Sequence, residues 1–212
     1  DLNFDNTDMR AAMIDAMLYW VYEANIDGFR CDYADGVPYG FWQTVWDTMD
    51  TIPNRDIIAF AEGARSDHFQ AGFDMSFGWE WYSALKVAFN GGTPAALYEA
   101  HLSEYNQVAA GKEWLRFTTN HDETAWDKPP TIIFGGLDGA MAAFTTTLFT
   151  GGVPLIYSSQ EIGVTQNIPF FSQSVLDWSS NPSYLQRYVD ILGVYKNNAV
   201  FRKGNNTFYP YD

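Results

Sequence analysis

Short apolar segments alternate with helical segments along almost the whole sequence. The apolar segments predict strands at 29–32, 57–61, 72–77, 114–119 and 153–158. Apolar residues at helical spacing predict helices at 7–24, 39–52, 79–89, 95–108, 138–149 and 183–196. Strands that alternate with helices of about 10–15 residues are typical of βαβ units. The sequence therefore predicts an α/β fold with a parallel sheet.

Polar side chains follow four of the five predicted strands, at the point where each strand ends. They are Asp32, Glu62, Asp122 and the pair Gln160-Glu161. In parallel α/β folds the functional site lies at the carboxyl ends of the strands. We therefore expect these side chains to contribute to one site.

The carboxyl groups of Asp32 and Glu62 have sequence neighbours that favour different ionisation states. Arg30 and Asp32 lie on the same face of their strand because side chains alternate, and the arginine would keep this carboxylate ionised. Glu62 follows the apolar run 57–61, where desolvation favours the protonated form of a carboxyl group. One protonated and one charged carboxyl group are the equipment of glycoside hydrolysis. From the residues alone, a glycosidase, a metal site and a phosphosugar enzyme all stay open.

The charge of the chain excludes several classes of partner. Its 12 Lys+Arg against 26 Asp+Glu give a formal net charge of −14, which disfavours nucleic acids and anionic membrane surfaces. No apolar run reaches the roughly 18–20 residues that span a bilayer. The single cysteine, Cys31, excludes an internal disulfide and is predicted to be a packing residue. An aromatic content of 17% fits a sugar-binding surface and an aromatic-rich core equally well.

Four segments carry a resemblance to a known family. They are Gly28–Pro38 (GFRCDYADGVP), Ala61–Gly63 (AEG), Phe117–Glu123 (FTTNHDE), and Gly152–Tyr157 (GVPLIY) with Gln160-Glu161. In this order they resemble the motifs of the fourth, fifth, seventh and eighth barrel strands of the alpha-amylase family of glycoside hydrolases. The opening Asp1-Leu2-Asn3 with Asn6 resembles the stretch between the third and fourth strands.

The resemblance implies a role for each motif residue. It implies that Asp32 is the nucleophile and that Arg30 contacts it. It implies that Glu62 is the general acid/base, that Asp122 is the third carboxylate, and that His121 binds the sugar in the first subsite.

Some aromatic and histidine residues leave two interpretations open. Tyr33 and Phe170-Phe171 lie in loops at the same edge, where they would either stack on sugar or pack within the loops; Tyr33 is included among the predicted substrate-binding residues. The segment 79–82 is either a sugar platform or core packing. His68 and His101 belong to no motif and are predicted to lie at the surface.

The resemblance also implies the architecture and the activity. It implies a partial TIM (β/α)8 barrel over residues 1–200, with about five parallel strands and outer helices. The three N-terminal βα units are missing, and 201–212 would be the start of a truncated C-terminal β region. The implied activity is retaining hydrolysis of α-1,4-glucosidic bonds in starch-like glucans, weak or absent in this chain alone. A non-catalytic glucan-binding or structural fragment and a transglycosylase of the same family are the alternatives.

Cofactors and partners follow from the same resemblance. We predict no metal ligand in this sequence, although calcium is possible in a full-length member. Where the family often has a Lys-His pair after the position of Asp35, this chain has Gly36-Val37. The expected partner is an α-glucan, with self-association or a complementing N-terminal half covering the missing part of the barrel. The substrate class suggests an extracellular or periplasmic location.

Overall fold

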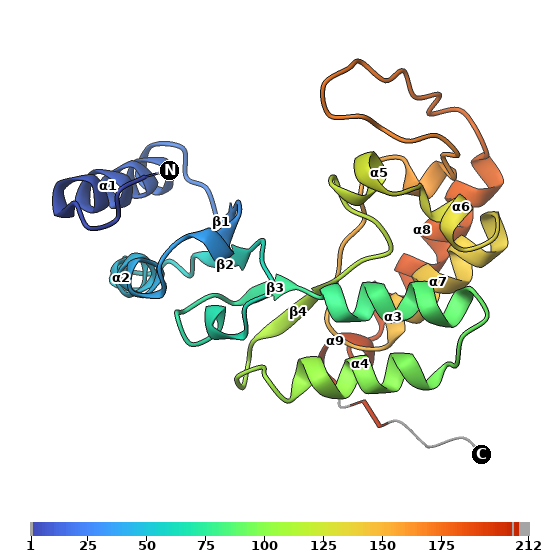
Figure 1. Cartoon of the computed structure of the whole chain (residues 1–212), viewed down its shortest axis with the longest axis horizontal. Coiled ribbons are helices and arrows are strands. Elements are labelled where there is room, and N and C mark those ends of the chain that lie inside the picture. The colour runs from blue at the N-terminus through green and yellow to red at the C-terminus, as the bar shows by residue number, and fades with distance from the viewer. Residues whose placement is uncertain (1, 205, 208–212) are drawn as a thin grey trace. The chain divides into compact units, whose positions relative to one another are not determined.

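The computed structural model describes residues 2–204, 206 and 207, and the chain divides into two units (Figure 1). The first unit comprises the chain up to Phe77 together with Gln107–Trp114. The second unit comprises Gly78–Asn106 and the chain from Leu115 onward.

The first unit contains two long helices and three strands. Its elements are α1 (Thr7–Glu23), β1 (Gly28–Cys31), η1 (Ala34–Gly36), α2 (Tyr39–Met49), β2 (Ile58–Ala61), η2 (Ser66–His68) and β3 (Met75–Phe77). The Asn6 side chain accepts hydrogen bonds from two backbone N–H groups in the first turn of α1, which explains where this helix begins. Strand β1 pairs in parallel with β2, and β2 pairs in parallel with β3.

The core of the first unit is built by the buried face of α2. Phe41, Trp42, Val45, Trp46 and Met49 recur at helical spacing and are all buried. The Trp42 and Trp46 rings contact a single ring, Phe73, edge to face at centroid distances of 5.1 and 5.0 Å. Part of the high aromatic content therefore serves packing.

The second unit is mostly helical. Its elements are α3 (Trp79–Phe89), α4 (Ala95–Tyr105), α5 (Glu123–Trp126), α6 (Pro130–Ile133), α7 (Leu137–Phe149), β5 (Val153–Pro154), η3 (Gln160–Ile162), α8 (Pro182–Asn197) and α9 (Val200–Lys203). Helices α7 and α8 pack through Phe144 and Tyr188, whose rings stack at 4.4 Å. Strand β4 (Glu113–Arg116) is shared between the units, and its Leu115 pairs in parallel with Val153 of β5.

The sheet confirms the predicted fold class. In the described part of the chain, five strands follow the order β1-β2-β3-β4-β5, with helices between them. This is the succession of parallel strands and helices that a partial (β/α) barrel requires. Strand β1 is as long as predicted and the other four are shorter. Strand β3 begins late because Gly72 has a positive φ of 115°, and β5 ends at Pro154.

Two histidine predictions were wrong, because both side chains are buried. His68 lies with its Nε2 3.2 Å from Asp35, and burial lowers its pKa. The ring of His101 stacks on Tyr105 at 4.5 Å, and its Nδ1 lies 3.2 Å from an Arg116 nitrogen. Each histidine is buried because a partner distant in the sequence offers it a polar contact.

The remaining expectations have mixed outcomes. Cys31 is buried, and this burial raises the pKa of its thiol to about 12, as suits a packing residue. Helix α9 occupies the beginning of the segment 201–212, while residues 205 and 208–212 lie outside the described part, so a β region there stays a prediction. None of the helices in the described ranges has the length and apolar character needed to cross a bilayer.

Candidate functional site

The first part of the candidate site lies at the carboxyl ends of β1 and β2. Cys31 and Ala61 are register partners, so Asp32 and Glu62 leave their strands at the same level of the sheet. The Glu62 N–H donates to the Cys31 carbonyl at 2.9 Å, which continues the ladder one residue past the strands. The sheet register itself therefore brings these two acids together.

One arginine contacts both carboxylates. Arg30 Nη1 lies 2.7 Å from Asp32 Oδ1, and Nη2 forms an ion pair with Glu62 Oε1. The side chain of Asp32 is 78% exposed, whereas that of Glu62 is 12% exposed. The two carboxyl groups therefore share one cation but differ in their contact with water.

Tyr33 adds a backbone donor to this group. It adopts left-handed backbone angles (φ 45°, ψ 46°), which are uncommon for a residue other than glycine. In this conformation its N–H donates to Glu62 Oε2 at 3.2 Å, while its ring remains exposed. The strained turn therefore helps to orient the glutamate.

Asp35 braces the loops that follow the two strands. Its carboxylate accepts hydrogen bonds from the backbone N–H groups of Ala64 at 3.0 Å and Arg65 at 3.2 Å. A β-carbon at Gly63 would collide with the Asp35 carboxylate and the His68 ring, so only glycine allows this close approach. Sequence reasoning missed this role of Asp35, although the residue lies inside the first quoted motif.

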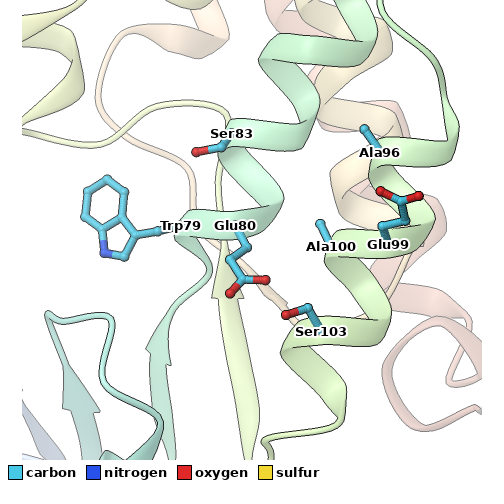
Figure 2. A pocket seen from close by; sticks show the side chains of 7 residues that line it. All are labelled: Trp79, Glu80, Ser83, Ala96, Glu99, Ala100 and Ser103. Atoms are coloured by element: carbon cyan, nitrogen blue, oxygen red, sulfur yellow. The ribbon is translucent and has the colours of Figure 1, made fainter.

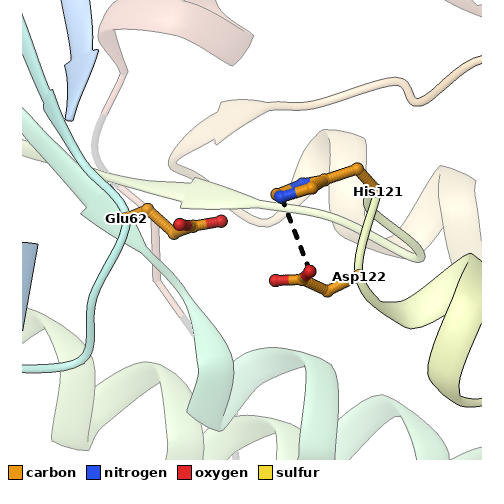
Figure 3. A group of neighbouring side chains, drawn as sticks. All are labelled: Glu62, His121 and Asp122. Atoms are coloured by element: carbon orange, nitrogen blue, oxygen red, sulfur yellow. Dashed lines mark ion pairs between the residues drawn. The ribbon is translucent and has the colours of Figure 1, made fainter. Parts of the chain in front are cut away.

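The second unit holds the other predicted site residues, His121 and Asp122, just after β4. The Asn120 side-chain oxygen accepts N–H hydrogen bonds from Asp122 at 3.0 Å and Glu123 at 2.9 Å, which fixes the start of α5. His121 Nε2 lies 3.6 Å from Asp122 Oδ1, as the dashed line of Figure 3 marks. The same figure draws Glu62, which follows β2 in the first unit.

The polar pair after β5 divides into a buried and a half-buried residue. Gln160 is buried, its Oε1 accepts the Tyr157 N–H at 2.9 Å, and its amide nitrogen reaches the Tyr188 hydroxyl at 3.3 Å. Glu161 is half-buried. Gln160 therefore holds its own loop against α8 and is not presented to a ligand.

The segment 79–82 packs within the second unit. Trp81 and Tyr82 are buried, and the half-buried Trp79 ring meets Phe117 edge to face at 5.1 Å. A hollow of about 460 Å³ between α3 and α4 is lined on one side by Glu80 and on the other by Ser103, and Figure 2 shows the Trp79 ring directed away from α4. The core-packing interpretation therefore holds for Trp81 and Tyr82.

The carboxylate of Asp35, in the loop after β1, is taken up by contacts within the protein. Calcium takes six to eight oxygen ligands in proteins. The Asp35 carboxylate is already engaged by two backbone N–H groups and by His68. Calcium in a longer protein stays a prediction.

Several proteins of known identity are similar in sequence to this chain. An alpha-amylase of Haloarcula japonica is 31% identical over 166 residues, which are 77% of this chain and 24% of that protein. An intracellular maltogenic amylase of Bacillus subtilis is 31% identical over 97% of this chain and 35% of its own length. The chain thus spans about a quarter to a third of these relatives. A comparison with protein-family models gives no match.

Solved structures share the fold. A maltogenic alpha-amylase of Thermotoga neapolitana matches 95% of this chain and 46% of its own, with a TM-score of 0.80 and 25% identity. An alpha-amylase of Geobacillus thermoleovorans in complex with acarbose matches 96% of this chain and 47% of its own, with a TM-score of 0.82 and 20% identity. These likenesses confirm the partial barrel. By its motifs, its relatives and its fold, the chain belongs to the alpha-amylase family.

Proposed function

We propose that this chain carries the catalytic carboxylates of a retaining glycoside hydrolase that cleaves α-1,4-glucosidic bonds in starch-like glucans. The observation that carries the proposal is the shared arginine, because the Arg30 guanidinium contacts both Asp32 and Glu62. A cation between two carboxylates keeps them close despite their like charges. Retaining enzymes need this closeness, with carboxyl groups about 5–5.5 Å apart.

The two acids take different roles in this mechanism. The Asp32 carboxylate attacks the anomeric carbon and forms a covalent glycosyl ester, while the bond to the leaving oxygen breaks. Glu62 donates its proton to that oxygen, and it then removes a proton from the water that hydrolyses the ester. The enclosed position of Glu62 and the solvated position of Asp32 support this division.

Three further residues would hold the sugar. Asp122 and His121 are both partly exposed, so their polar atoms are open to hydroxyl groups of a glucosyl unit. The exposed Tyr33 ring offers a flat apolar face beside the nucleophile. We assign His121 and Tyr33 to substrate binding, and Asp122 to the catalytic group as the third carboxylate, which holds substrate hydroxyls.

Substitution of each acid tests the assignment, with α-glucosyl fluoride as the substrate. Its good leaving group needs little acid assistance, so Glu62→Gln keeps much of its fluoride release while losing starch hydrolysis. Azide then attacks the ester without a base, restores turnover of the Gln variant and gives the α-azide. Asp32→Asn loses both reactions because the covalent step is gone.

The opposite pattern would contradict the roles. If Asp32→Asn released fluoride and formed an α-azide, the nucleophile and the acid would have to be exchanged. The test is made on the 212-residue chain, alone and mixed with the N-terminal half of a related barrel, because we expect the chain alone to be weakly active or inactive. Misplacing catalytic groups by 1 Å costs roughly 100-fold.

The second candidate function is glucan binding without turnover. The high exposure of the Asp32 side chain favours it, because active sites that carry out this chemistry usually exclude water from the reacting groups. Equilibrium binding of soluble starch without release of reducing ends would identify it. A transglycosylase would transfer the glycosyl group to a second sugar and give longer products, which chromatography of the reaction mixture detects.

A further inference from the structure

An exposed aromatic cluster lies in the second unit, outside the motifs. Trp126 is 74% exposed, Phe171 is 97% exposed and Phe170 is 39% exposed. With Ala125 and Pro169 they line a hollow of about 280 Å³. Large aromatic side chains are seldom left in contact with water as a group unless they bind something.

The cluster is held in a fixed shape by the backbone. The Ile168 N–H donates to the Thr124 carbonyl at 3.0 Å, and the Asn167 amide donates to the Asp127 carbonyl at 2.5 Å. These bonds join the loop before Phe170 to helix α5, and the Trp126 and Phe170 rings meet edge to face at 5.2 Å. A surface already ordered in this way loses little entropy when a ligand binds.

The cluster continues directly from the candidate sugar-binding residues. The Trp126 N–H donates to the Asp122 carbonyl at 2.8 Å, so the tryptophan lies one helical turn from that acid. On the other side, the Phe170 ring lies 6.3 Å from the His121 ring. A chain of sugar units that leaves His121 and Asp122 would therefore meet the aromatic rings next.

We propose that Trp126, Phe170 and Phe171 form a stacking subsite for the glucosyl units that follow the one bound by His121 and Asp122. The proposal rests on the proposed function, because that function supplies the neighbouring sugar. Sugars present apolar C–H faces that pack on aromatic rings. The volume of the hollow, about 280 Å³, is close to the lower end of the range for small-ligand sites, about 300 Å³, and suits a sugar unit.

Binding of maltooligosaccharides of increasing length tests the subsite. The chain carries Asp32→Asn as a background substitution to prevent turnover, and affinity for maltose, maltotriose and maltoheptaose is measured by calorimetry. Trp126→Ala and Phe171→Ala should each weaken maltoheptaose binding roughly 3- to 10-fold and change maltose binding little. Trp20→Ala is the matched control, because Trp20 is also an exposed tryptophan on a helix, at 54%, and lies in the first unit outside the cluster.

Several results would overturn the proposal. One is the same affinity for maltoheptaose in the Trp126→Ala and Trp20→Ala chains, or no maltoheptaose binding in either. Another is a change of oligomeric state in Trp126→Ala with unchanged sugar affinity, which would assign the cluster to protein contact. Fluoride release is measured without the Asp32 substitution and with the N-terminal half of a related barrel added, and it separates the two hypotheses. Trp126-dependent binding without fluoride release from this mixture keeps the subsite and contradicts hydrolysis.

Discussion

Two arginines on strands, one in each unit, hold acidic side chains in opposite environments. Arg30 of β1 lies at the edge of the sheet, one-third exposed, between Asp32 and Glu62. Arg116 of β4 is fully buried, and its guanidinium donates to Glu104 Oε2 at 3.1 and 2.7 Å. The same kind of ion pair thus occurs once in contact with solvent and once inside the fold.

The buried group serves the architecture of the second unit. Arg116 also donates to the Thr150 carbonyl at 3.0 Å and lies over the Trp81 ring at 4.1 Å. Glu104 accepts the Trp81 N–H at 2.9 Å, which satisfies a donor in the first turn of α3. Every polar atom of the pair is directed at protein, so this cluster joins helices and strand, whereas the Arg30 group remains accessible to a ligand.

The largest predicted effect is on stability, from loss of the buried arginine. Arg116→Ala leaves the Glu104 carboxylate buried without its cation, so the free energy of unfolding should fall by about 3–5 kcal/mol. Urea denaturation followed by tryptophan fluorescence measures the change. If the variant does not fold, Glu104→Gln removes the charge with less change in shape and should still cost more than 1 kcal/mol. If both variants lost less than about 1 kcal/mol of unfolding free energy, the Arg116 cluster would not be structural and would not differ from the Arg30 group in this respect.

The second prediction concerns the pH dependence of the same cluster. Burial, and to a smaller degree the charge of Arg116, lowers the pKa of His101 to about 4 from the usual 6.5. As the pH falls from 6.5 to 4, the unfolded chain therefore binds a proton that the folded chain does not. The stability contributed by neutral His101 is complete above pH 6.5 and is lost as the pH falls towards 4, by up to about 3 kcal/mol.

Urea denaturation at several pH values between 4 and 7 checks this prediction. The His101→Gln variant carries no titrating ring, so its stability should fall less steeply in that window than the stability of the unsubstituted chain. If the unfolding free energies of the two proteins changed with pH in the same way, the Arg116 cluster would be insensitive to protonation of His101.

The smallest predicted stability effect is at the exposed arginine. Arg30→Lys keeps the positive charge at a solvent-screened position, so the free energy of unfolding should change by no more than about 1 kcal/mol. A lysine lacks the planar fork that contacts two carboxylates at once, so glucosyl fluoride turnover should fall roughly 100-fold if the proposed roles hold.

The exposed pair of Arg187 with Asp138, at 2.7 Å, is the matched control. Arg187→Ala removes a surface ion pair that lies outside the candidate site, so both stability and turnover should stay within measurement error. A stability loss in Arg30→Lys as large as that of Arg116→Ala would mean that Arg30 also belongs to the architecture.

Elements with a strong periodic pattern were predictable from the sequence. The helix predicted at 79–89 has the same bounds in the structure, because aromatic and apolar residues occupy one face throughout. Helices α5 and α6 were missed, since four residues are too short to give a period. The strand at 153–158 was overestimated because the assigned strand ends at Pro154, and one further backbone bond, from the Leu155 N–H to the Arg116 carbonyl at 2.8 Å, follows it.

The contacts that were missed join residues far apart in the sequence. The burial of His68 depends on Asp35, 33 positions away, and that of His101 on Arg116, 15 positions away. Motifs predicted which acids follow the strands, because a strand end is a local feature. They did not predict that Arg30 also reaches Glu62, or that Asp35 braces the next loop, because those contacts arise only when two strands pair in register.

Gly63 is a position in the candidate site where substitution should abolish activity, although glycine has no reactive side chain. Any side chain there would press on Asp35, which braces the loop after Glu62, and on the His68 ring beside it. A random mutational screen for inactive variants should therefore return Gly63 together with the two acids, although glycine has no group that could react. Such a variant would look like a catalytic defect in an activity assay while its cause is purely steric.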